Sequence, residues 1–167
     1  MKRILSIILI SATLFLFGCK GNVNTAQSGA VNFYYLQSSI VYNAEDGVVG
    51  SETYSAADAT PEELISQYFL GPTSQNLNSP FPENLKLISI TQKDNEVVIT
   101  VSKEMTSLSG LQLTLACSCL AKTMQSILPA ERYVISSADG KLDGRTSIVI
   151  TPETYLFVDS LPVLKGD

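Results

Sequence analysis

The sequence contains no histidine, and only three of its 167 residues are cysteine. The absence of histidine excludes Ser-His-Asp and Cys-His catalysis, together with every zinc site that uses a histidine ligand. No lysine has a serine three residues before it, and the chain has neither a Gly-x-Ser-x-Gly motif nor a phosphate-binding glycine loop. The sequence therefore predicts a protein that is not an enzyme and that uses no metal or cofactor.

Basic residues are also scarce, with 11 Lys and Arg against 16 Asp and Glu and a formal charge of -5. Proteins that bind nucleic acid depend on Lys and Arg to neutralise phosphates, so this composition argues against a nucleic-acid partner. Removal of an N-terminal leader containing Lys2 and Arg3 would take the formal charge from -5 to -7. An acidic protein of this kind is not expected to lie flat on anionic lipid.

The first 19 residues have the pattern of an export signal. Lys2 and Arg3 precede an uncharged apolar run over 4–17, which is short for a membrane span of roughly 20 residues and typical of a cleaved signal peptide. Gly18 and Cys19 follow, and the segment resembles a bacterial lipobox. That resemblance implies cleavage after Gly18 and diacylglycerol on Cys19, which would anchor the chain to the outer face of the cytoplasmic membrane. The alternative is an uncleaved anchor helix with an incidental cysteine.

The rest of the chain is long enough for a single domain with one hydrophobic core. We expect a signal peptide over 1–18, a flexible tether over 19–30, a folded domain over 31–160 and a C-terminal tail over 161–167. The tether is predicted from its Gly, Asn, Ser, Thr, Gln and Ala content.

Hydrophobic periodicity and turn residues predict an α+β fold, a small domain with a mixed or antiparallel sheet and two helices packed on it. The first helix has a capping box at Thr60 and Glu63 with Pro61 at its first position, and it ends at Gly71. A loop follows over 73–84. The second helix covers 109–128 and stops at Pro129. Strands are expected over 31–36, 85–92, 96–102, 132–137 and 146–150, and residues 39–42 extend or follow the first strand.

Several residues have both a functional and a structural interpretation. Phe33, Tyr34 and Tyr35 form either a sugar-binding face or core and edge packing, and packing is favoured. Residues 139–144 superficially resemble a calcium loop, but Lys141 occupies a ligand position, so two turns are expected. In the second helix we expect Cys117 to be a buried hydrophobe, whereas Cys119 lies on the flank of the apolar face and could be a stray thiol.

The order of these motifs resembles the GerMN domain, a family first described in a spore-germination protein of endospore-forming bacteria. The matching residues read L-I-S-Q-Y-F-L-G-P-T over 64–73, then S-P-F-P over 79–82, a strand pair, a long helix and a strand leading to D-G-K over 139–141. The resemblance implies an α+β domain related to ring-building modules of sporulation machinery, often on lipoproteins, with no catalytic residues to carry over.

The sequence thus suggests a lipid-anchored, non-catalytic interaction domain with a structural or assembly role in the cell envelope or in spore formation and germination. Its partners would be the membrane, through the lipid, and envelope or sporulation proteins or a second copy. The alternative is a module that binds cell-wall glycan or a small ligand. Leu111 and Leu115 lie about 160° to 200° from the centre of the apolar stripe of the second helix, facing away from the sheet. Either another segment of the chain covers them or they contact a partner.

Replacing Cys19 with alanine tests the lipid anchor directly. Because the thioether forms on the Cys19 sulfur, the Cys19→Ala protein should stay unprocessed and unlabelled by radioactive fatty acid. Cleavage after Gly18 with undiminished membrane attachment in this variant would show that the lipobox interpretation is wrong.

Overall fold

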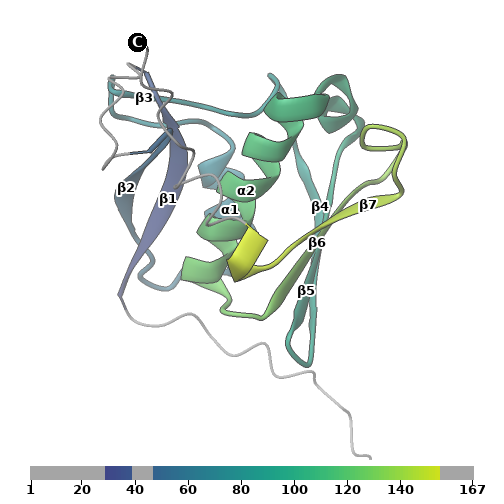
Figure 1. The fold of residues 1–167 in the computed structure, drawn as a ribbon. Coiled ribbons are helices and arrows are strands. Elements are labelled where there is room, and N and C mark those ends of the chain that lie inside the picture. Colours follow the sequence, from purple (N-terminus) through teal and green to yellow (C-terminus); the bar gives the residue numbers. More distant parts are fainter. Residues whose placement is uncertain (1–28, 39–46, 155–167) are drawn as a thin grey trace, which may run out of the picture.

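The computed structural model describes residues 29–38 and 47–154 of the chain. Two β-sheets stand on either side of a helical layer, and the long helix α2 runs between them (Figure 1). In chain order the elements are β1 (Ala30–Gln37), β2 (Val49–Ser55), α1 (Pro61–Tyr68), β3 (Leu77–Asn78), β4 (Leu87–Lys93), β5 (Glu96–Val101), the 3-10 helix η1 (Lys103–Ser107), α2 (Gly110–Ile127), β6 (Arg132–Ser137) and β7 (Ser147–Ile150).

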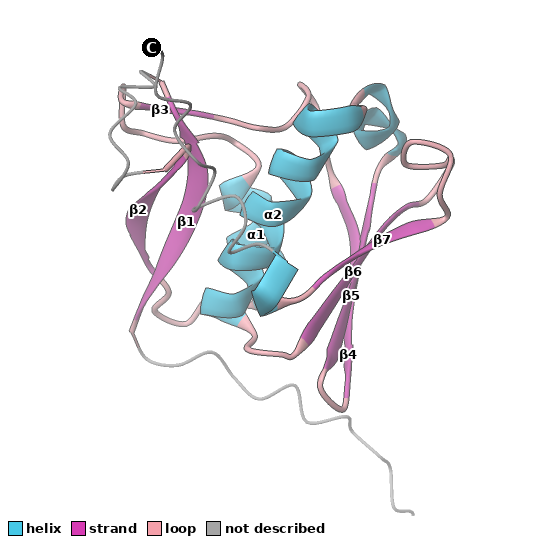
Figure 2. Ribbon diagram, viewed as in Figure 1, coloured by secondary structure: helices cyan, strands magenta, loops and turns pink. Residues whose placement is uncertain are grey.

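The strands divide into two sheets (Figure 2). The first has the order β2-β1-β3 and is antiparallel. The second has the order β4-β5-β6-β7, in which only the pair β5 and β6 is parallel. The chain leaves β5 and returns to β6 through η1 and α2, because a parallel pair needs a long crossover. The predicted α+β class is confirmed, with the strands shared between two sheets.

Helix α2 is buried on more than one side. The apolar stripe predicted from the sequence is confirmed, since Leu113, Ala116, Cys117, Leu120, Met124 and Ile127 are all buried. Ser118, Cys119 and Thr123 on other sides of the helix are buried as well. Cys119, which was placed on the flank of the apolar face, is thus fully buried, because the first sheet also packs against α2.

The hydroxyl groups of α2 complete the hydrogen bonding of β1. Along one edge β1 pairs with β2, and along the other edge β3 pairs only with Leu36 and Gln37. The remaining part of that second edge meets α2, where the N–H groups of Asn32 and Tyr34 donate to Ser126 Oγ at 2.8 Å and Thr123 Oγ1 at 2.9 Å. The helix thus takes the place of a neighbouring strand, and the edge groups of β1 are not left without partners.

The first helix begins as its sequence predicts. Thr60 Oγ1 accepts the N–H of Glu63, and the Glu63 carboxylate accepts the N–H of Thr60, which forms the complete capping box with Pro61 at the start. The hydrogen bonds from Thr60 lower the pKa of Glu63.

The sequence did not predict β2, the two-residue strand β3 within the expected loop, or η1. The predicted strands over 31–36, 85–92, 96–102, 132–137 and 146–150 are confirmed within one or two residues, and so is the hairpin of β4 and β5. The possible extension over 39–42, the leader, most of the tether, and the C-terminal tail lie outside the described residues.

Substituting Thr123 tests the contact between α2 and β1. Valine has nearly the same shape but no hydroxyl, so Thr123→Val leaves the Tyr34 N–H without its acceptor and should lower the free energy of unfolding by about 1–3 kcal/mol. Thr114→Val is the matched control, because the Thr114 hydroxyl only donates to the carbonyl of Gly110 on the exposed side of the same helix. Its effect should stay within about 0.5 kcal/mol. Equal urea-denaturation curves for the two variants would contradict this role of Thr123.

Candidate binding groove

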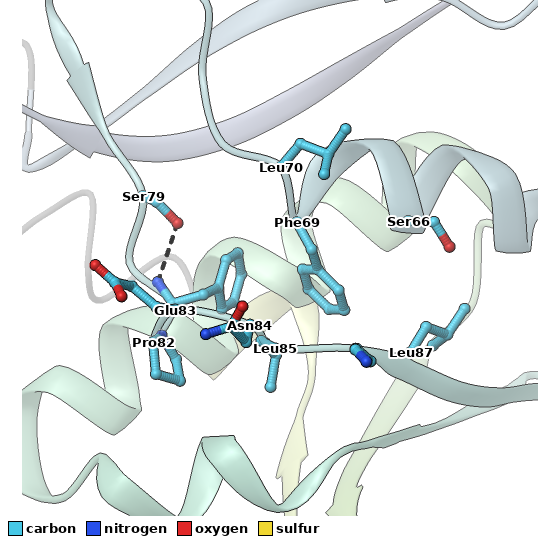
Figure 3. Close-up of a pocket in the computed structure, with 11 residues that line it drawn as sticks. Ser66, Phe69, Leu70, Ser79, Pro82, Glu83, Asn84, Leu85 and Leu87 are labelled. Atoms are coloured by element: carbon cyan, nitrogen blue, oxygen red, sulfur yellow. Dashed lines mark hydrogen bonds between the residues drawn. The ribbon is translucent and has the colours of Figure 1, made fainter.

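A groove of about 760 Å³ lies between the end of α1 and the segment that leads into β4, and it is the candidate site for holding another molecule (Figure 3). Three of its residues belong to α1 or follow it directly, and the others precede or begin β4. It is lined by Ser66, Phe69, Leu70, Ser79, Phe81, Pro82, Glu83, Asn84, Leu85, Lys86 and Leu87.

The end of α1 forms one wall of the groove. The N–H of Gly71 bonds to the carbonyl of Tyr68, and Gly71 has a φ of +96°, a conformation that a side chain would strain. The chain therefore turns sharply after the helix and leaves Leu70 at the rim, where its side chain is 78% exposed.

Local hydrogen bonds hold the opposite wall. Ser79 Oγ accepts the N–H of Phe81, and the N–H of Leu85 donates to the carbonyl of Pro82. Asn84 between them has a φ of +62°, which asparagine tolerates better than most residues. The Ser-Pro-Phe-Pro segment is thus a defined turn rather than a loose connection.

An aromatic cluster joins the floor of the groove to the core. The Phe69 and Phe81 rings meet edge to face at 5.0 Å between centroids, and Tyr68 lies 5.1 Å from Phe81. The Tyr68 hydroxyl donates to the carbonyl of Tyr34, and the Tyr35 hydroxyl donates to the carbonyl of Tyr68 at 3.0 Å. Burial raises the pKa of Tyr68, with a further contribution from Cys119, so its hydroxyl remains a proton donor to Tyr34.

A carboxylate from β2 fixes the chain that follows α1. The Glu52 side chain accepts hydrogen bonds from the N–H and hydroxyl of Thr73 and from the N–H of Ser74, at 2.9 to 3.2 Å. This contact ties the first sheet to the segment that runs on toward Ser79, and so helps to hold both walls in place.

Neither of the two cysteines in α2 lines the groove. In residues 29–38 and 47–154 there is no group of three or more His, Cys, Asp and Glu side chains that could hold a metal ion. Cys117 is buried in the core, and burial raises the pKa of its thiol to about 12, so the nucleophilic thiolate is scarce at neutral pH. Residues 139–144 form the two predicted turns, with Asp143 and Gly144 at positive φ.

The residues singled out from the sequence do not gather in the groove. Leu111 lies at the start of α2 and is 66% exposed, while Leu115 is half-buried. Gly18 and Cys19 lie outside the described residues. Phe33 and Tyr35 are buried, which confirms the packing interpretation for these two residues, and the Lys122 ammonium lies 5.1 Å from the centroid of the Tyr34 ring.

The groove itself was missed at the level of sequence. Its two walls carry Leu70, Gly71 and Pro72 and the run 79–82, which were noted only as marks of a family resemblance. Nothing in the spacing of these motifs indicates that they approach each other in space.

Over the described part of the chain, no helix combines the length and apolar character needed to cross a bilayer.

Comparisons with known proteins agree with the resemblance. Residues 32–143 match the model of the Germane family, whose description reads "sporulation and spore germination". The first GerMN domain of the sporulation protein GerM from Bacillus subtilis is 14% identical, with a TM-score of 0.53 over 74% of this chain and 98% of that one. The tandem GerMN domains of the same protein are 13% identical, with a TM-score of 0.56 over 77% of this chain and 46% of that one.

A candidate lipoprotein from Clostridium perfringens is 19% identical and covers 75% of this chain and 89% of its own, with a TM-score of 0.44. No functionally curated protein matched the chain. At these identities the two GerM structures establish a shared fold.

The burial of both cysteines in α2 predicts that their thiols are protected. In the full chain with Cys19→Ser, kept in detergent micelles at pH 8, Cys117 and Cys119 should not react with a disulfide reagent on the timescale on which a free thiol reacts fully. Both should react after unfolding in concentrated guanidinium, which serves as the control. Rapid labelling of Cys117 or Cys119 in the folded protein would contradict the packing of α2 described above.

Proposed function

Because the chain belongs to the Germane family, we propose that it is an exported lipoprotein whose folded domain docks onto other proteins outside the cytoplasmic membrane. The role would be structural, in the cell envelope or in spore formation and germination. One observation carries this proposal: the family match covers 32–143, which includes most of the described domain.

The N-terminal segment supports the anchored part of the proposal. Cys19 follows Gly18 at the end of a short apolar run, which suits lipid attachment. Two acyl chains give stable anchoring, whereas one chain gives only marginal binding. The described domain begins at Gly29, so its attachment to the bilayer would be a short segment beyond Cys19.

The chemistry of the domain supports docking over catalysis. Histidine is absent from the whole chain, and the groove is lined mainly by apolar and small polar side chains with Glu83 and Lys86 as its only charges. A surface of this kind can recognise a partner by shape and apolar contact.

The second candidate is a module that binds cell-wall glycan or a small ligand through exposed tyrosines and polar loops. The burial of Phe33 and Tyr35 removes two aromatics of the first strand from such a surface. A pull-down that recovered glycan strands and no protein would nevertheless favour it.

Substituting Leu111 and Leu115 tests docking through α2. We expect the double variant Leu111→Ser, Leu115→Ser to keep its melting temperature nearly unchanged, because Leu111 is largely exposed and Leu115, although half-buried, lies outside the hydrophobic core cluster. In the producing cell, chemical crosslinking of the full anchored chain should show weaker association with envelope proteins. Thr114→Val between them is the control.

Two results would contradict this interpretation of α2. A large fall in melting temperature would mean that another segment of the chain covers the two leucines. A variant with unchanged stability and unchanged associations would remove the pair from the contact surface. Deleting the gene tests the wider role, since unaltered envelope assembly and unaltered spore formation and germination would argue against it.

A further inference from the structure

We propose that the groove beside α1 binds an extended apolar peptide segment of a partner protein, which pairs with the outer edge of β4 as an added strand. This inference rests on the docking function proposed above. It names the surface that docks and the conformation of the segment that it accepts.

The backbone at the start of β4 provides the first argument. Within the described part of the chain, β4 is the edge strand of its sheet and pairs only with β5. The N–H of Lys86 donates to Ser102 Oγ and its carbonyl accepts the N–H of Ser102, both at 2.9 Å. In an antiparallel pair successive residues point their backbone groups in opposite directions, so those of Leu87 are directed away from β5. These are the groups that an added strand would bond.

The position of these groups provides the second argument. Leu87 belongs both to β4 and to the lining of the groove. Ser66 of α1 and the residues Phe69 and Leu70 that follow the helix form the facing wall. The groove thus lies between a helix and an edge strand. A peptide placed there would gain hydrogen bonds from the strand and side-chain contacts from the helix, the arrangement by which sheets accept peptides as extra strands.

The side chains define what the peptide should carry. The groove presents Phe69, Phe81, Leu85 and Leu87, and Leu70 at its rim is already 78% exposed. Glu83 and Lys86 have opposite charges, so the lining has no net charge that would favour an ionic ligand. In an extended peptide alternate side chains point the same way, so apolar residues at positions i and i+2 would enter the groove together.

The bulge in β4 limits the length of the added strand. The register of β4 against β5 shifts between Leu87 and Ser89, and Ile88 at this point is 55% exposed. Bulges commonly end pairing along a sheet edge. The added segment should therefore be short and centred on Leu87, and a long helix would not satisfy the backbone groups there.

Selection from a displayed library of random linear peptides, using the full chain in detergent micelles, tests the proposal. Selected peptides should share apolar residues at alternate positions. Their Kd should rise at least tenfold with Leu70→Glu, which places a carboxylate at the apolar rim. Val149→Glu on the opposite edge strand β7 is the matched control and should bind as the parent does. Thermal melts of both variants should coincide with that of the parent.

A scan of N-methylated peptides gives a test that leaves the protein unchanged. Methylation removes a backbone donor, so it should weaken binding at least tenfold at alternate amides of a selected peptide and have little effect at the amides between them. This pattern is specific to strand pairing, since a peptide held only by side chains would lack the alternation.

Several outcomes would overturn the inference. They are a failure to select any peptide, binding that Leu70→Glu leaves unchanged, apolar residues spaced as on a helix, and an N-methyl scan without alternation. Loss of a self-associated form in Leu70→Glu, with no peptide bound, would assign the groove to a second copy and would equally overturn it. Crosslinks to envelope proteins that survive Leu70→Glu would leave the docking function standing without this groove.

Discussion

The contact between β1 and α2 is the constraint on which the rest of the structure depends. Helix α2 lies between two sheets (Figure 1). It must therefore present apolar side chains to the core on one side and hydrogen-bond acceptors to the edge of β1 on another. Thr123 and Ser126 meet the second requirement because residues three apart lie on the same face of a helix. With this contact in place, Tyr68 of α1 can reach the carbonyl of Tyr34, and both helices are fixed against the first sheet.

Local signals in the sequence were sufficient to predict most of the helices and strands. The capping box at Thr60, the stop at Pro129 and the alternation around Ile99 each depend on residues close together in the chain, and the structure has the corresponding elements. Strand β2 was missed because its sequence, VGSETYS, has only weak alternation and gains its conformation by pairing with β1. Its residues become a strand through a tertiary contact that periodicity does not reveal.

The surface of α2 shows the same limit of prediction from local sequence patterns. Counting rotation along the helix correctly identified its apolar stripe, and a helix of this kind would ordinarily expose the opposite side. Polar residues such as Ser118 and Thr123 then appear to be solvent-facing. They are buried here because a second sheet packs where a one-sheet arrangement would leave water. The groove escaped notice for a related reason. Its two walls meet through a tertiary contact between Phe69 and Phe81, which the pattern within either segment does not reveal.

The hydrogen bonds between β1 and α2 join residues 89 and 94 positions apart in the sequence. A chain is synthesised N-terminus first, so β1 is made well before the helix that completes its edge. Until α2 emerges, the N–H groups of Asn32 and Tyr34 face solvent, and the apolar side chains of Phe33 and Tyr35 have no core to enter. A strand with an unpaired edge and exposed apolar side chains is prone to aggregation and to proteolysis. The fold of this domain thus makes its earliest segment dependent on its late one, and a chaperone that met the growing chain would have most to protect in the first half of the domain.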